Sequence, residues 1–158
     1  MNKILADMHT HTIASGHAYA TLTEMCKEAA NKGLEIYGIT EHSSGIPGTC
    51  ADIYFQNLRV VPRDLFGLDL RLGAEINIID YNGTLDLDQK YIDRLDFVIA
   101  GIHSVCYKFG SKEENTAAVI NAIKNPNVNI ISHPDDGRCL LITKPLFRLQ
   151  KNITFFLK

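Results

Sequence analysis

The stretch Asp7-Met8-His9-Thr10-His11 follows directly on the short apolar run Ile4-Leu5-Ala6. If residues 4–7 form a strand, its side chains alternate, so His9 and His11 lie on the same side at its end. Two neutral imidazoles on one side can share a zinc, iron, manganese or nickel ion. The plainer interpretation is a pair of solvated surface histidines, and the rest of the chain decides between the two.

The next segments predict a helix followed by a second strand. Thr21-Leu22-Thr23-Glu24 is typical of a capping box at the start of a helix. Apolar residues at helical spacing follow it, and Gly33 is placed to end the helix. Residues 34–39 then form an apolar run with Thr40-Glu41-His42 at its end. We therefore expect a βαβ unit that carries metal-ligand residues at both strand ends.

The same patterns continue along the chain. Residues 43–50 read as a loop, and the pattern becomes less clear between residues 58 and 72. The expected helices cover residues 52–57, 89–95 and 112–124, the expected strands cover residues 73–78, 96–101 and 128–132, and Asp80-Tyr81-Asn82-Gly83 predicts a tight turn.

Each of the five expected strands carries a metal-ligand residue at or near its C-terminal end. A single such histidine is more often a hydrogen-bonded core or loop residue. In parallel α/β barrels, however, the C-terminal strand ends face one mouth, where active sites lie. Five strands with the same feature therefore predict one shared metal site. The candidate ligands are His9, His11, His17 in the loop after the first strand, His42, Glu75, His103 and His133.

The number of candidate ligands predicts more than one ion. Six imidazoles and a carboxylate exceed the needs of one tetrahedral zinc, so we expect a dinuclear or trinuclear site. Glu75 lies inside an apolar strand, where a charge is costly unless it is paired or bound to metal, so it is the natural bridge between two ions. We interpret Glu41 either as a partner that supports His42 or as a solvated acid.

Clustered divalent ions indicate hydrolysis of phosphate esters, with metal-activated hydroxide as the nucleophile. We expect Glu75 and His103 to be the catalytic residues and a small phosphorylated molecule to be the substrate. The sequence contains no P-loop, no Rossmann glycine pattern and no Gly-x-Ser-x-Gly motif that would indicate another chemistry.

Composition supports an ordinary globular domain. The 158 residues are 46% hydrophobic and 22% charged, and a net charge of −2 gives no reason to expect a nucleic-acid or membrane partner. No apolar stretch near the start is long enough for a signal peptide, and the four cysteines form no C-x-x-C motif. We therefore expect reduced thiols and a cytoplasmic protein.

Six motifs in this order resemble the PHP (polymerase and histidinol phosphatase) family, and within it the small bacterial YcdX-like phosphatases. The resemblance runs from residue 1 to about Arg138. It implies a distorted seven-stranded α/β barrel, which is incomplete here, and a trinuclear metal site. This site usually holds zinc, and manganese or iron is also possible. The motifs are Asp7-Met8-His9-Thr10-His11, His17, Ile39-Thr40-Glu41-His42, Gly73-Ala74-Glu75, Ala100-Gly101-Ile102-His103 and Ile131-Ser132-His133-Pro134.

The resemblance also implies how the ligands are shared. The family often has Asp where Glu41 stands, and it supplies a further Asp and His from a late Asp-x-His motif that this sequence lacks. The first and third ions would each lose one of these ligands. By the resemblance, the first ion is held by His9, His11 and Glu75, the second by Glu75, His103 and His133, and the third by His17 and His42.

Residues 139–158 differ from the rest of the chain. Up to Asp136 there are 18 acidic and 11 basic residues, whereas 5 basic residues and no acid follow it. We interpret residues 1–158 as a single partial domain with family-like residues 1–138 and an atypical basic tail. The plainer interpretation of this tail is a terminal segment that packs over the open barrel edge.

A second and more specific hypothesis is that a frameshift produced this basic, acid-free tail. Read from the last base of Leu141 in a shifted frame, permissible codons give DYKAVVQAAKEHHVFLE, which has the helical spacing and apolar run that a barrel needs next. We expect a truncated or frameshifted barrel, whose open edge favours self-association. Two other functions stay open: a catalytically impaired metal-binding fragment, and a nuclease-type phosphodiesterase, against which the lack of a basic surface argues.

Overall fold

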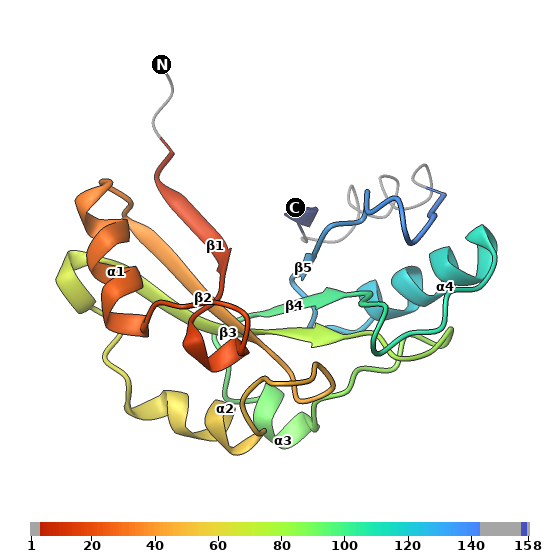
Figure 1. Cartoon of the computed structure of the whole chain (residues 1–158), viewed down its shortest axis with the longest axis horizontal. Coiled ribbons are helices and arrows are strands. Elements are labelled where there is room, and N and C mark those ends of the chain that lie inside the picture. The colour runs from red at the N-terminus through yellow and green to blue at the C-terminus, as the bar shows by residue number, and fades with distance from the viewer. Residues whose placement is uncertain (1–3, 143–155, 158) are drawn as a thin grey trace.

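The computed structural model describes residues 4–142 and 156–157, which form one curled parallel sheet with helices along it. Figure 1 shows the sheet in the centre, with α1 at its left, α2 and α3 below it and α4 at its right. Every neighbouring pair of strands is parallel, and the strands follow one another in chain order. The strands are β1 (Ala6–Thr10), β2 (Ile36–His42), β3 (Asp69–Asn77), β4 (Val98–Gly101), β5 (Ile130–Ile131) and β6 (Phe156–Leu157).

Parallel strands in sequential order, joined by helices and loops, make an incomplete α/β barrel, as the sequence predicted. The observed strands differ from the expected ones mainly in length. Strands β2 and β3 pair residue by residue from Ile36 opposite Asp69 to His42 opposite Glu75. Because of this continuous pairing, β2 extends through His42. Strand β3 begins at Asp69, four residues before the expected start at residue 73.

The two longest helices each begin at a capping box. Thr21 and Glu24 form both hydrogen bonds of the expected capping box, and Gly33 follows the helix with a φ of 76°. Ser111 and Glu114 form a second capping box, which starts the longest helix. The helices are α1 (Leu22–Asn31), α2 (Ile53–Asn57), α3 (Gln89–Ile92) and α4 (Lys112–Ile123), with 3-10 turns η1 (Ile13–Ser15), η2 (Leu58–Val60) and η3 (Leu65–Gly67).

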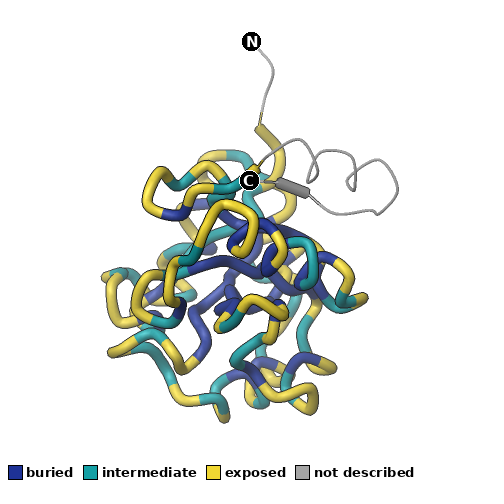
Figure 2. The backbone as a smooth tube through the Cα atoms, turned by 90° about the vertical axis from the view of Figure 1, so that its right-hand side faces the viewer, coloured by how far each residue is buried: buried dark blue, intermediate teal, exposed yellow. Residues whose placement is uncertain are grey.

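The core is built around β3. Leu70, Leu72, Ala74 and Ile76 on this strand are all 0% exposed. A strand covered on both faces is typical of parallel sheets, which explains its nearly continuous apolar sequence. Figure 2 shows the buried residues gathered in the interior beneath a shell of exposed loops. Glu75 is thus the one acid in a strand segment that is otherwise packed into the core.

The described structure does not test three of the sequence-based predictions. The basic tail and the shifted-frame reading lie almost wholly outside the described residues, since of residues 143–158 only the backbone of β6 is described. Self-association through the sheet edge stays a prediction. Within the described part of the chain, none of the helices is both long and apolar enough to cross a membrane.

We predict that Gly38→Ala destabilises the protein through the contact between β1 and β2. A Cβ at this position would lie 2.8 Å from the Cα of Met8 and 2.9 Å from its carbonyl oxygen, so the two strands would have to separate. The expected loss in the free energy of unfolding is about 1–3 kcal/mol, measured by urea denaturation. Gly137→Ala is the control, since a Cβ there meets no atom within 4 Å. Equal midpoints for the two variants would contradict this account.

Candidate metal centre

The strand ends bring five imidazoles around one carboxylate. Glu75 is only 1% exposed, and each of its two oxygens faces histidine nitrogens from other strands or loops. Because β2 places His42 directly opposite Glu75 and β4 leads into His103, the parallel register itself produces this convergence. Oε2 lies 2.9 Å from His9 Nε2, 3.2 Å from His11 Nε2 and 3.4 Å from His42 Nδ1, and Oε1 lies 3.3 Å from His103 Nε2 and 3.1 Å from His133 Nε2.

The remaining candidate, His17, lies at the exposed side of the cluster. Its Nε2 is 3.2 Å from the Nε2 of His42, and its ring centroid is 5.1 Å from that of His11. All seven residues that the sequence singled out therefore come together in one place. Their role as metal ligands and the catalytic role of Glu75 and His103 remain proposals.

Two backbone features let the rings near β4 and β5 approach Glu75. Gly101 has no side chain, and a Cβ there would lie 2.2 Å from Ser132 Oγ and 3.3 Å from Cε1 of both His103 and His133. His133 itself has a φ of 31°, which is unfavourable for a residue with a side chain. The local chain thus accepts strain where it presents an imidazole to the carboxylate.

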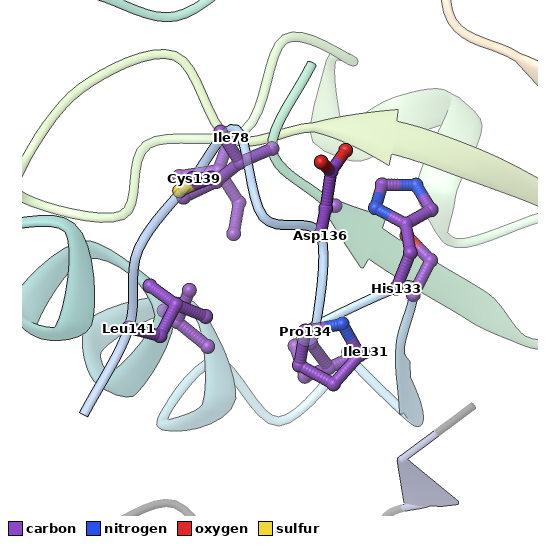
Figure 3. Close-up of a pocket in the computed structure, with 11 residues that line it drawn as sticks. Ile78, Ile131, His133, Pro134, Asp136, Cys139 and Leu141 are labelled. Atoms are coloured by element: carbon purple, nitrogen blue, oxygen red, sulfur yellow. The ribbon is translucent and has the colours of Figure 1, made fainter. Parts of the chain in front are cut away.

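Figure 3 shows the surroundings of His133, whose ring lies beside the carboxylate of Asp136 at the rim of a small pocket. Apolar residues, including Ile78, Ile131 and Leu141, line most of its interior. The cavity holds about 10 Å³, which is room for a single water and not for a phosphate ester.

Burial and the carboxylate set the protonation of the cluster in the metal-free protein. Burial raises the pKa of the Glu75 carboxyl, but its hydrogen-bonding contacts with four surrounding imidazoles outweigh this effect and hold the pKa below its ordinary value. Burial lowers the pKa of His42 to about 3, although Glu75 opposes this. The hydrogen bond to Glu75 raises the pKa of His133 above its ordinary 6.5, against the effect of burial.

The ring nitrogens and the Glu75 carboxylate oxygens suit metal coordination better than they suit hydrogen bonding with one another. Five ring nitrogens face a carboxylate that offers about four lone-pair sites. The Nδ1 atoms of His42 and His103 are buried, and no described residue forms a hydrogen bond with them. Imidazole nitrogen with carboxylate oxygen is also the donor set that suits zinc, iron and manganese. The residues present therefore fit divalent metal ions.

Among the residues that the structure describes, three groups have ligand atoms that all lie within 4.8 Å of one another. Glu75 belongs to two of the groups, which is the bridging position predicted for it. The grouping differs from the one that the family resemblance implies, because His42 joins Glu75 and His103, and His11 joins His17. The groups are His9 with His11 and Glu75, His42 with Glu75 and His103, and His11 with His17 and His42.

Glu41 is not the solvated acid that one interpretation allowed. It is fully buried, and it accepts hydrogen bonds from Thr12 and Ser15. Ser15 in turn contacts His11, with Oγ 3.1 Å from Nδ1. No sequence motif pointed to Ser15, which stands four residues after His11.

A second polar network, which the sequence reasoning also missed, joins the loops beside the site. Ser43 Oγ donates to Asp86 Oδ1 at 2.5 Å, and Asn77 donates to both Asp86 oxygens. These bonds tie the loop after β2 to the segment after β3. Asn77 lies two residues after Glu75, so it shares the face of the strand that carries this carboxylate.

Comparison with known proteins identifies the family. The PHP domain family matches residues 7–132, a span that includes all but the last of the seven converging residues. The chain belongs to the PHP domain family. A probable phosphatase of Acetivibrio thermocellus is 46% identical over 149 residues, covering 94% of this chain and 62% of the relative. A probable phosphatase of Caldicellulosiruptor saccharolyticus is 49% identical over 145 residues, covering 92% of this chain and 57% of the relative.

The family resemblance drawn from the motifs is thereby confirmed. This PHP domain chain spans less than two thirds of the length of these curated relatives. Its fold is similar to that of a histidinol phosphate phosphatase from Lactococcus lactis, whose structure was solved with zinc, L-histidinol and phosphate. The TM-score is 0.51 at 21% identity, over 83% of this chain and 58% of the other. That likeness agrees with an incomplete barrel of the PHP type.

We predict that Glu75→Gln lowers the pKa of His133 in the metal-free protein. The carboxylate stabilises the charged imidazole, so its neutral replacement brings this pKa down toward or below 6.5, as NMR titration would measure. A raised histidine pKa adds stability that is present below pH 6.5 and is lost as the pH rises through the folded-state pKa, so the variant loses this contribution.

Asp136→Asn is the matched control for this titration. The Asp136 carboxylate acts on His133 through its charge alone, so we expect a smaller decrease in the pKa. An unchanged pKa of His133 in Glu75→Gln would contradict the contact between the two side chains.

Proposed function

We propose that this chain binds two or three divalent metal ions around Glu75 and hydrolyses small phosphate monoesters. The observation that carries the proposal is the buried Glu75 carboxylate with five imidazole nitrogens within 2.9–3.4 Å of its oxygens. The names of the relatives as probable phosphatases support the reaction class. The zinc in the Lactococcus lactis structure and the nitrogen-rich ligand set together favour zinc, with manganese or iron as alternatives.

The proposed roles of the residues follow from their places. Glu75 would bridge neighbouring ions, because it belongs to two of the ligand groups. His103 and His133 face Oε1, and His9 and His11 face Oε2, so each side of the carboxylate has its own imidazoles. When bound, the ions supply Lewis acidity that activates water and polarises a phosphoryl oxygen.

One side of the proposed metal site is buried and closed to solvent. Glu75 and His42 are buried, whereas His17 is exposed, so a substrate would approach from the side of His17. The nuclease-type alternative stays less favoured because the net charge is −2. The cytoplasmic location inferred from the sequence stays a prediction.

Metal content and two chromogenic substrates test the proposal. The chain is purified, stripped with a chelator, reloaded with zinc or manganese and counted by elemental analysis. We expect two or three ions per chain and hydrolysis of p-nitrophenyl phosphate that the chelator abolishes. Bound metal without hydrolysis would favour the impaired fragment, and faster hydrolysis of bis-p-nitrophenyl phosphate would favour a phosphodiesterase. A chain that binds no metal would overturn the proposal.

We predict that Glu75→Gln loses more metal than any single histidine variant of the site. The carboxylate belongs to two ligand groups, so its loss weakens two ions at once, whereas His9, His17 and His103 each belong to one group. His11 and His42 also belong to two groups, but a neutral imidazole brings no negative charge to the ions. Elemental analysis after equal exposure to zinc measures the difference. Glu28→Gln is the control, because Glu28 is an exposed acid that pairs with Lys32 on α1. Equal losses from Glu75→Gln and His9→Gln would contradict a bridge.

A further inference from the structure

Glu41 is a buried carboxylate that the proposed chemistry does not use. It is 0% exposed on β2, and among the described residues no lysine, arginine or histidine forms an ion pair with it. A buried charge without such a partner needs several hydrogen bonds. Thr12 supplies its backbone N–H, at 3.2 and 3.1 Å from the two oxygens, and its hydroxyl at 2.5 Å from Oε1, while Ser15 Oγ lies 2.5 Å from Oε2. All of these groups can donate, which is the pattern that an ionised carboxylate requires.

The Ser15 hydroxyl is the link between Glu41 and the metal centre. A hydroxyl has one proton to donate and two lone pairs to accept with. The proton goes to Glu41, and one lone pair accepts from the backbone N–H of His42 at 3.2 Å. The other lone pair faces His11 Nδ1 at 3.1 Å. Because Ser15 has no second proton, the hydrogen bond forms only if His11 Nδ1 carries the proton.

We propose that Glu41, acting through Ser15, holds His11 in the tautomer that is protonated on Nδ1. This leaves the lone pair on Nε2, the atom that lies 3.2 Å from Glu75 Oε2. A neutral imidazole has one N–H, so in the metal-free protein Ser15 competes with Glu75 for the proton of His11, and the proposal is that Ser15 prevails. Glu41 and Ser15 are thus positioning residues that aim a ligand atom of His11 at the ion shared with Glu75. The inference rests on the proposed metal-binding function and extends it to two residues outside the ligand set.

The chain around Ser15 is built to keep this hydroxyl in place. Thr12 caps η1 by accepting from the N–H of Ala14, and Gly16 ends it with a φ of 74°. A Cβ at Gly16 would lie 2.1 Å from the carbonyl oxygen of Gly48, so the turn packs directly against the loop after β2. Ser15 itself is 1% exposed. The hydroxyl therefore has no room to exchange its partners for water.

The tautomer is read directly by NMR of protein labelled with ¹⁵N-histidine. Spectra are recorded on the metal-free protein at about pH 9, where imidazoles are neutral, and again with zinc alone. In the unmodified chain we expect His11 to show its proton on Nδ1. In Ser15→Ala we expect a mixture of tautomers and a zinc dissociation constant about 10- to 100-fold higher, from competition with a chelating dye.

Two further variants distinguish the loss of the Glu41–Ser15–His11 hydrogen bonds from a general loss of structure. Glu41→Gln offers one oxygen in place of two, so the hydroxyls of Thr12 and Ser15 compete for it and the Nδ1–H population of His11 should fall. Ser43→Ala removes another buried serine hydroxyl, which donates to Asp86 and not to Glu41, and should leave the tautomer of His11 as it is. Circular dichroism and the melting temperature confirm that each variant is folded.

The outcomes distinguish this inference from the proposed function. A His11 that carries its proton on Nε2 in the unmodified chain overturns the inference. So does a Ser15→Ala variant that keeps both the Nδ1–H tautomer and the zinc affinity. If the unmodified chain binds no zinc, the proposed function fails, while the tautomer of the metal-free protein still decides whether Glu41 and Ser15 hold His11.

Discussion

A buried carboxylate on the central strand is the constraint on which the structure of this PHP domain chain depends. Glu75 is 1% exposed between residues that form the core of β3, where an isolated charge would cost several kcal/mol. Five imidazoles from four other strand ends and their loops offset this cost. The parallel register is what allows them to do so, because it brings the C-terminal ends of all the strands to one edge.

The surroundings of the carboxylate are organised in a second layer that holds the imidazoles in place. Gly101 leaves space for the rings of His103 and His133, and His133 itself has a positive φ where its ring faces Oε1. On the other side, the hydrogen bonds of Glu41 and Ser15 orient His11. Preorganised ligands of this kind bind metal without a large cost in conformational entropy. The chemistry proposed at Glu75 would therefore depend on residues that never touch the proposed ions.

Local signals predicted most of the elements, because their causes lie within a few residues. The capping box at Thr21, the turn before Gly83 and the end of the helix at Gly33 are all decided by neighbouring side chains. Strand lengths were predicted less well. Asp69 and Arg71 begin β3 although they are charged, since their backbone pairs with β2 and this pairing does not depend on an apolar side chain.

By itself, the sequence determined the seven converging residues, the parallel α/β architecture and the family. The reason is that the order of the motifs and their positions after apolar runs can be read along the linear sequence. Only the tertiary structure decided which histidines share an oxygen of Glu75, and that His42 joins the group of His103. It alone also showed that Glu41 is buried and that Ser15 meets His11. The physical reason is that a hydrogen bond is made or lost within less than an ångström. Packing between segments far apart in the chain sets such distances, and no local pattern records them.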